Sequence, residues 1–369
     1  MADVVVYRAE GAAVLAGGGD LYGFTVTEWD LPATYPPFAA LLFAPAAWVP
    51  SAVLKGAFLL GNIALVVALV RVSCRLAGLR VSWAGVCGLA AFALWLEPVF
   101  QTVLFGQVNL ALAVVVIWDL TRRDGASGKG VALGVAAGIK LTPAIFIVYL
   151  FLAGRRREAA RATVACLATV AVGALVLPTA SVDFWTRRLY ETSRVGKPWI
   201  VDNQSLQGLV ARALHVAEPG WWWALPVAAL GLYAAYRHPR HGLVLTALTG
   251  LLISPISWSH HWVWCVPLLA ATWSTGHRRA ALALAALFTS RTMWLLPHEG
   301  PLDLHLPWYA QPLASPYPLA TLLLLTYAVA TPLHPPRPAP GTALPTLPPW
   351  GRQIAQGCDG CPSARRSRG

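Results

Sequence analysis

Six short polar motifs interrupt an otherwise apolar chain and hold the side chains best suited to chemistry. Between them they contain a carboxylate, a lysine, two adjacent histidines and several side-chain amides. A carboxylate can take a proton from an attacking hydroxyl, cationic groups can bind a phosphate, and amides can bind sugar hydroxyls. The motifs are DVVVYR (3–8), LPATYPP (31–37), FGQVN (105–109), IKLTP (139–143), DNQS (202–205) and SWSHH (257–261).

Charged residues in apolar surroundings are the first candidates. Asp3 precedes the apolar stretch Val4–Tyr7; it could act as a general base toward an acceptor hydroxyl or, alternatively, cap a helix or anchor it at an interface. Lys140 lies between apolar half-segments, where an ammonium is costly unless it is paired or hydrated. A phosphate would be a natural partner for it, and snorkelling to the interface is the alternative. Glu97 is a second costly charge that could pair with Lys140 or bind substrate.

Two adjacent histidines, His260 and His261, lie among tryptophans and are candidates for contact with a phosphate or a leaving group. The alternative is a place in the aromatic belt of a membrane interface. Successive residues of a helix point about 100° apart, so one of the two is expected to face a site. The sequence has no HxxxH, no DxD and no HxE combined with CxxC, and no metal site is expected. Cys358 and Cys361 form a single CDGC, which we leave unassigned.

Polar uncharged groups complete the set of candidates. Two prolines after Tyr35 predict a rigid entry into an interfacial helix over 36–50, and the tyrosine could also contact a sugar. Side-chain amides supply the paired donors and acceptors that sugar hydroxyls require. The candidates for sugar or acceptor binding are Tyr35, Glu97, Gln107, Asn109, Asn203 and Gln204.

The composition places these motifs in a membrane protein. Hydrophobic residues make up 57% of the chain and charged residues 12%, against about 25% charged in an average soluble domain. A soluble domain could not keep so much apolar surface from water. The net charge of +12 comes from short basic clusters between apolar segments, which is typical of cytoplasmic loops rather than of nucleic-acid binding.

The apolar segments predict an all-α, polytopic fold with about ten or eleven membrane helices or half-helices. The segment Val131–Leu152 is flanked by basic residues and interrupted by Lys140 and Pro143. Two half-helices, or a tight pair returning to the same side, therefore fit it better than a single crossing. The predicted helical segments are Val53–Arg71, Ser82–Glu97, Val108–Leu120, Val131–Leu152, Ala162–Leu177, Trp221–Tyr236, Gly242–Ile253, Trp262–Trp273, Ala280–Leu296 and Leu319–Ala330.

Basic residues set the orientation of the fold. The positive-inside rule assigns the clusters at 71–80, 122–129, 155–161, 237–240 and 278–279 to the cytoplasm. With that assignment, all six polar motifs fall on the extracytoplasmic side. The sequence thus predicts a multi-pass plasma-membrane protein whose active site faces outward.

The same reading divides the chain into two parts. A membrane domain is predicted over 1–331, with outer loops at 1–52 and 181–219. Residues 332–369 are rich in proline and arginine and are predicted to form a disordered cytoplasmic tail.

The motifs and their order resemble glycosyltransferase family 87, the polyprenol-phosphate-mannose-dependent α-mannosyltransferases of actinobacterial envelopes. The resemblance covers residues 3–330 and includes a D-x-x-V-Y pattern from Asp3 to Tyr7. The other segments that carry it are LPATYPPFAALLFAPAAWVP, FGQVNLALA, GVAAGIKLTPAIFIVYL, DNQSLQGLVARAL and SWSHHWVW.

This resemblance implies a GT-C fold and an inverting enzyme that moves mannose from polyprenyl-phosphate mannose to a glycolipid or polysaccharide acceptor, typically through α-(1→2) linkages. It implies that Asp3 is the catalytic base and that Lys140, His260 and His261 contact the donor phosphate. Donor, acceptor and membrane lipids are the implied partners, with no cofactor and no nucleic acid. Family members carry a transmembrane helix before this aspartate, so we expect a start upstream of Met1 and a first helix missing from this sequence.

Two other functions remain open from the sequence. A transporter or flippase for lipid-linked sugars would also need polar groups in an apolar bundle, but would place them near the midplane and on both faces. An inactive truncated membrane relic would follow if the first helix is truly missing. The gathering of the motifs on one side favours the enzyme.

Overall fold

The computed structural model describes residues 1–297 and 300–331, which belong to one compact unit. The predicted tail at 332–369, with Cys358 and Cys361, lies outside the described residues. Helices provide nearly all the regular structure of the described part, and one short antiparallel hairpin pairs β1 (Thr25–Val26) with β2 (Leu31–Pro32). The helices are α1 (Ala2–Leu15), α2 (Pro37–Phe43), α3 (Ser51–Leu76), α4 (Trp83–Ala93), α5 (Glu97–Phe105), α6 (Asn109–Thr121), α7 (Val131–Ile139), α8 (Ile145–Leu152), α9 (Arg156–Val176), α10 (Pro178–Thr186), α11 (Leu206–Leu214), α12 (Ala224–Arg237), α13 (Gly242–Ile253), α14 (Cys265–Ser274), α15 (Arg278–Thr289), α16 (Gln311–Ala314) and α17 (Pro316–Ala330).

The expected break inside Val131–Leu152 is confirmed. Helix α7 ends at Ile139, Lys140 is extended with φ −143° and ψ 131°, and a 3₁₀ turn at Thr142–Ala144 leads into α8. Pro143 lacks the N–H that would continue a helical hydrogen-bond ladder. The break leaves Lys140 in a turn between two apolar helices.

The N-terminal segment differs from the expectation of an outer loop over 1–52. Residues 2–15 form the helix α1, with Val4, Val6 and Tyr7 buried. Helix α1 packs against α2 and the 3₁₀ segment that follows it, Ala44–Trp48, which together match the interfacial helix predicted over 36–50. Because of this packing, Asp3 stands in the first turn of a helix rather than in a loop.

Two helices, α3 and α9, are long and apolar enough to cross a membrane on their own. Two bent pairs, α4 with α5 (81°) and Trp308–Ala314 with α17 (83°), raise that number to as many as four among the described residues if each pair is one span. The expectation of about ten or eleven segments included half-helices too short to cross alone. The described residues are those of an all-α, polytopic membrane protein.

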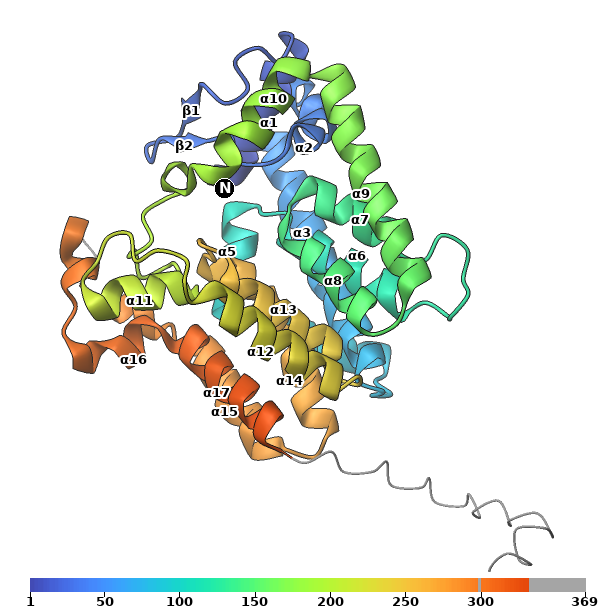
Figure 1. Cartoon of the computed structure of the whole chain (residues 1–369), viewed down its shortest axis with the longest axis vertical. Helices are drawn as coiled ribbons and strands as arrows, with labels where there is room; N and C mark the ends of the chain where they lie inside the picture. The colour runs from blue at the N-terminus through green and yellow to red at the C-terminus, as the bar shows by residue number, and fades with distance from the viewer. Residues whose placement is uncertain (298–299, 332–369) are drawn as a thin grey trace, which may run out of the picture. The chain divides into compact units, whose positions relative to one another are not determined.

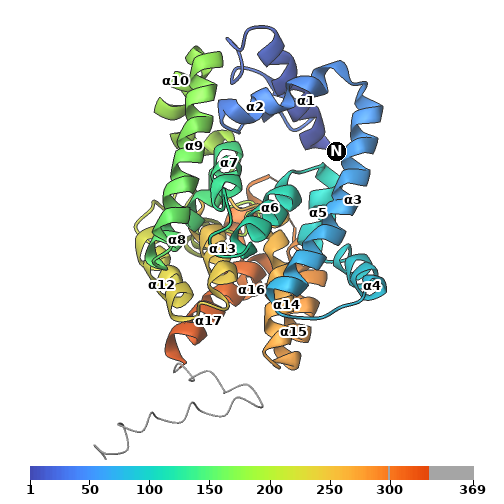
Figure 2. The same ribbon diagram turned by 90° about the vertical axis from the view of Figure 1, so that its right-hand side faces the viewer.

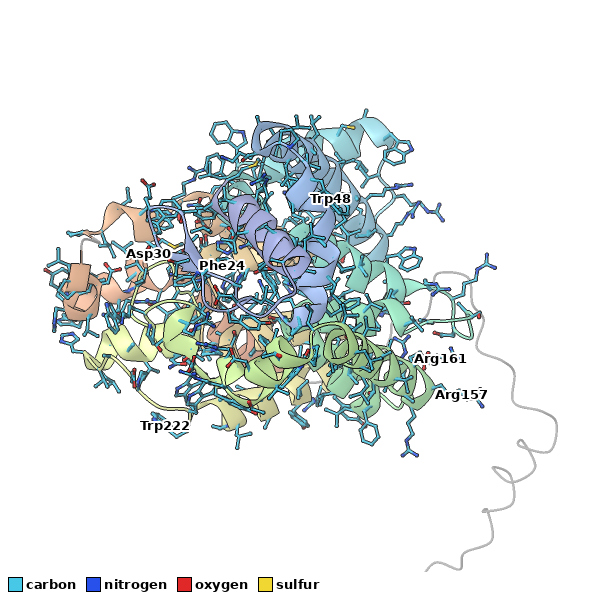
Figure 3. The ribbon with its side chains drawn as sticks, turned by 90° about the horizontal axis from the view of Figure 1, so that it is seen from above. Phe24, Asp30, Trp48, Arg157, Arg161 and Trp222 are labelled. Carbon is cyan, nitrogen blue, oxygen red and sulfur yellow. The ribbon has the colours of Figure 1, made fainter. Side chains whose placement is uncertain are left out.

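Figure 2 shows α3 and α9 on opposite sides of this unit, each running from the end that holds α1, α2 and α10 to the other end. The two helices run in opposite directions along the chain, and Figure 1 shows the start of α9 far from α10. Arg75 is in the last turn of α3, and Arg155–Arg157 stand at the start of α9. Both basic clusters therefore lie at the end away from α1. Figure 3 shows Arg157 and Arg161 pointing outward, on the side opposite Asp30.

A large apolar core holds the central helices together, and α13 is buried along almost its whole length. Small residues allow close packing elsewhere, as they do in many membrane helix pairs. A Cβ added to Gly134 or Gly138 of α7 would overlap α9, at the carbonyl of Ala162 or the side chain of Thr169. A separate small cluster around Tyr7, Tyr35 and Ala39 holds α1 against the loop that follows the hairpin.

Candidate active site

A cavity of about 690 Å³ brings most of the sequence motifs together. Its walls come from α1, the hairpin, the turn between α5 and α6, the break between α7 and α8, the segment before α11 and the SWSHH motif. The predicted site residues that line it are Asp3, Tyr35, Gln107, Lys140, His260 and His261.

Asp3 enters the cavity because α1 packs closely on the end of α5. Gly106 ends α5 in the left-handed region (φ 76°), and a Cβ there would overlap the side chain of Val4. Burial raises the pKa of Asp3 to about 6, and a hydrogen bond with Gln107 and the positive charge of Lys140 partly oppose that rise. The carboxyl group is therefore mainly ionised at neutral pH and remains a usable base.

Gln107 is held by two phenol groups. Its Oε1 accepts hydrogen bonds from the hydroxyls of Tyr7 (3.1 Å) and Tyr35 (3.0 Å), which lie 3.2 Å from each other. Burial keeps the pKa of both phenols above the ordinary value, so they stay protonated and can donate. Since both donors occupy the carbonyl oxygen, the amide nitrogen of Gln107 is left for other acceptors.

Lys140 is the centre of a second group of contacts. Its Nζ lies 3.0 Å from Asn109 Oδ1, 3.0 Å from His261 Nε2 and 5.4 Å from the ring centroid of Tyr35. The amide nitrogen of Asn109 donates to the carbonyl of His260 at 3.1 Å, so Asn109 joins Lys140 to the SWSHH motif. An ammonium has three N–H donors, and these two hydrogen bonds use two of them.

Both histidines line the cavity, which corrects the expectation that only one would face a site. Ser259–Trp264 forms a kinked 3₁₀ segment, in which successive side chains point about 120° apart, so both rings line the cavity because it borders this segment on two sides. The two rings lie 4.7 Å apart and nearly perpendicular. His260 is 5% exposed, and neither of its ring nitrogens has a hydrogen-bond partner among the described residues.

Asn203 and Gln204 do not line the cavity, contrary to the expectation from DNQS. Asn203 Nδ2 donates to the carbonyls of Pro198 (2.9 Å) and Pro255 (3.1 Å), and its Oδ1 accepts from the backbone N–H of Ser257 (2.9 Å). Gln204 Nε2 donates to the backbone carbonyls of Val201 and Ala314. Both amides are fully buried and hold irregular backbone in place.

Glu97 also lies away from the cavity lining and does not pair with Lys140. Its carboxylate accepts hydrogen bonds from Trp294 Nε1 (3.0 Å) and the Tyr317 hydroxyl (2.8 Å), and the residue is fully buried. These two donors satisfy the carboxylate inside the protein. Glu97 therefore links α5 by hydrogen bonds to the 3₁₀ segment Thr292–Leu295 and to α17.

The DNQS and SWSHH motifs are in direct contact. Asn203 and Trp258 form an antiparallel β-bridge, and the N–H of Gln204 donates to the carbonyl of Ser257 at 2.8 Å. Asp202 and Trp258 line the cavity beside this bridge. Sequence reasoning passed over both, and over the buried Tyr7, although the carboxylate of the DNQS motif was itself a signal for Asp202.

The side chains of the cavity are suited to one kind of chemistry. A carboxylate that can take a proton shares a cavity with a lysine and two histidines that can bind an anion. Among residues 1–297 and 300–331, no group of three or more His, Cys, Asp or Glu side chains is placed to hold a metal ion. A helical membrane protein with such a cavity is suited to transferring a group from a phosphate-linked donor to a hydroxyl.

The chain belongs to glycosyltransferase family 87, whose sequence model matches residues 33–255. Two curated relatives are similar over most of their length. One is a polyprenol-phosphate-mannose-dependent α-(1-2)-phosphatidylinositol mannoside mannosyltransferase of Mycolicibacterium smegmatis, 36% identical, with 80% of this chain and 77% of the relative covered. The other is the corresponding pentamannoside mannosyltransferase of Mycobacterium tuberculosis, 35% identical, with 89% and 81% covered. No solved structure gives a significant match.

Proposed function

We propose that this chain is an inverting mannosyltransferase that moves mannose from polyprenyl-phosphate mannose to a phosphatidylinositol mannoside or related glycolipid, forming an α-(1→2) linkage. The names of the relatives describe this donor, this class of acceptor and this linkage, and they support the enzyme rather than the transporter alternative. The observation that carries the proposal for this chain is the cavity that Asp3 shares with Lys140, His260 and His261.

The proposed reaction is a single displacement. The acceptor hydroxyl attacks the anomeric carbon of mannose on the face opposite the phosphate, and the new C–O bond forms as the bond to the phosphate oxygen breaks. Asp3 takes the hydroxyl proton, and the electron pair of the broken bond leaves with the polyprenyl phosphate. Because attack and departure occur on opposite faces, a β-linked donor gives an α-linked product.

The leaving phosphate needs compensation for its negative charge, and Lys140 and the two histidines can supply it. Lys140 retains one N–H beyond those bonded to Asn109 and His261. The ring nitrogens of His260 stand at the same wall without protein partners among the described residues. Hydrogen-bond donors that are already fixed in position stabilise a developing anion without reorganising.

The proposal includes a cavity that opens on the extracytoplasmic side. The basic ends of α3 and α9 lie at the end of the unit away from α1 (Figure 2). If that end faces the cytoplasm, as the positive-inside rule predicts, Asp3 belongs to the outer side.

Asp3→Asn tests this function most sharply, because the amide cannot take a proton. The full chain is reconstituted in vesicles with radiolabelled polyprenyl-phosphate mannose and phosphatidylinositol dimannoside, and glycolipid product is measured. We expect the wild type to form an α-mannosidase-sensitive product and Asp3→Asn to lose about 10²–10⁴-fold in rate.

Glu28→Gln provides the matched control, since Glu28 is an exposed carboxylate of the same N-terminal region outside the cavity lining. It should keep the wild-type rate. Normal transfer by Asp3→Asn would remove the proposed base, and wild-type transfer from a nucleotide sugar alone would contradict the proposed donor.

A further inference from the structure

We propose that Asp202 and Trp258 form a binding subsite for the acceptor, taking a hexopyranose ring through its hydroxyls and its apolar face. This inference rests on the proposed function and adds a residue pair that transfers no proton. Both side chains line the cavity that contains Asp3, and the β-bridge between Asn203 and Trp258 holds their backbones side by side.

Asp202 is fixed in place while it still reaches the cavity. Its Oδ1 accepts a hydrogen bond from the backbone N–H of Ser259 at 3.0 Å, and the side chain is half-buried at the cavity wall. An ionised carboxylate offers acceptor sites on both oxygens and donates nothing, so it matches the O–H donors of a sugar. Burial and the nearby Glu97 raise the pKa of Asp202 to about 7.

Trp258 supplies a flat apolar surface beside this carboxylate. A Cβ at Gly196, whose φ is 151°, would lie 2.5 Å from Cζ2 and 2.6 Å from Cη2 of the indole. The indole thus lies directly on the backbone of Gly196, which restricts how the ring can turn. A rigid aromatic surface next to a fixed hydrogen-bond acceptor can bind both the apolar face and the hydroxyl edge of one pyranose.

The position of the pair favours the acceptor over the donor. A small pocket of about 40 Å³ shares Lys140, Thr142 and His261 with the cavity, and its largely apolar lining includes Leu112, Phe146 and Trp264. That side suits a phosphate attached to a lipid. Asp202 and Trp258 do not line this pocket; they share the cavity lining with Arg188 and Thr192, whose guanidinium and hydroxyl groups suit a glycan. A glycan acceptor would approach from there.

The test is steady-state kinetics of the full chain with a short-chain polyprenyl-phosphate mannose as donor and octyl α-mannoside as acceptor, at pH 8 so that Asp202 is ionised. For Asp202→Asn and for Trp258→Ala we expect the acceptor KM to rise by about tenfold or more, with the donor KM unchanged. Asparagine keeps an Oδ1 for the N–H of Ser259, so this variant should unfold at the wild-type temperature. Gly196→Ala, which must displace the indole, should raise the acceptor KM in the same way.

Two control variants separate this effect from damage to the loops. Asp30→Asn changes an exposed carboxylate, and Trp199→Phe changes a tryptophan of the segment before α11; neither residue lines the cavity. Both should keep wild-type constants. Unchanged acceptor KM in Asp202→Asn, or a rise confined to the donor KM, would overturn the subsite while transfer by the wild type stands. Binding of octyl α-mannoside that depends on Asp202, in a wild type unable to transfer mannose, would instead refute the proposed function alone.

Discussion

The side-chain amides of two turns, FGQVN and DNQS, have different hydrogen-bond partners and different roles in this structure. In FGQVN, Gln107 bonds to two phenols and lines the cavity, and Asn109 bonds to Lys140. In DNQS, Asn203 and Gln204 bond almost entirely to backbone groups and are fully buried. The partners of an amide, which the sequence does not reveal, decide whether it serves the site or the fold.

The backbone around each turn explains this difference. FGQVN joins two helices, and the carbonyl of Thr102 already receives the N–H groups of Gly106 and Gln107. DNQS lies in an irregular buried segment, where the carbonyls of Pro198 and Pro255 need donors from outside any helix or sheet. The side chain of Asn203 meets that need. Asn203 therefore uses both amide N–H groups on backbone carbonyls, whereas Gln107 keeps its amide nitrogen for the cavity.

Within this comparison, the largest loss of activity is expected on substitution of Lys140, the hydrogen-bond partner of Asn109. Lys140→Met keeps the apolar stem and removes the ammonium that Asn109 and His261 hold. We expect a fall of about 10²-fold in kcat with the protein still folded, because a fixed cation at the leaving phosphate is lost. The measurement is mannosyl transfer by reconstituted protein. Lys197→Met, an exposed lysine stacked on Trp199, is the control and should behave as wild type. A wild-type rate for Lys140→Met would exclude Lys140 from the phosphate site.

Two single substitutions, one in each turn, test whether Gln107 serves the site and Asn203 serves the fold. Gln107→Ala should lower kcat/KM by about tenfold and change the unfolding temperature little, because one side of Gln107 faces a cavity. Asn203→Ala should lower the free energy of unfolding by about 3 kcal/mol, since it leaves buried backbone groups without partners. Its folded fraction should keep the wild-type kcat. Thermal unfolding in detergent and transfer assays measure the two quantities. If Gln107→Ala instead lowered stability and Asn203→Ala instead lowered kcat, the roles assigned to the two amides would be wrong.

Much of the fold followed from hydrophobic pattern, and the exceptions have local causes. Helices α3, α6, α9 and α13 and the break at Lys140 lie where apolar runs and Pro143 predicted them. Helix α1 was missed because its apolar residues do not form one clear stripe, and its burial depends on packing against Ala44–Trp48, far along the chain.

The candidate site could be predicted from sequence where the reactivity of a side chain points to a role. Asp3, Lys140 and the two histidines share a cavity, as the motifs suggested. Glu97 could not be separated from them by sequence, because its partners Trp294 and Tyr317 come from distant segments. That both histidines line the cavity depends on how the cavity surrounds Ser259–Trp264, which residue spacing alone does not indicate.

The smallest expected effect concerns the two phenols that hold Gln107. Tyr7→Phe removes one of two donors to Gln107 Oε1, and we expect kcat/KM to fall by about threefold, as does the loss of one ordinary hydrogen bond. Tyr35→Phe should act similarly.

The double variant tests whether the phenols orient Gln107. When both donors are absent, the amide of Gln107 can turn over and present its oxygen to Asp3, so the loss of kcat/KM should exceed the product of the two single effects. Tyr22→Phe serves as the control, because its hydroxyl donates to the backbone carbonyl of Tyr35 (2.8 Å) rather than to Gln107. Combined with Tyr7→Phe, it should give effects that simply multiply. Multiplicative behaviour in the Tyr7 and Tyr35 double variant as well would mean that the phenols pack α1 without setting the orientation of Gln107.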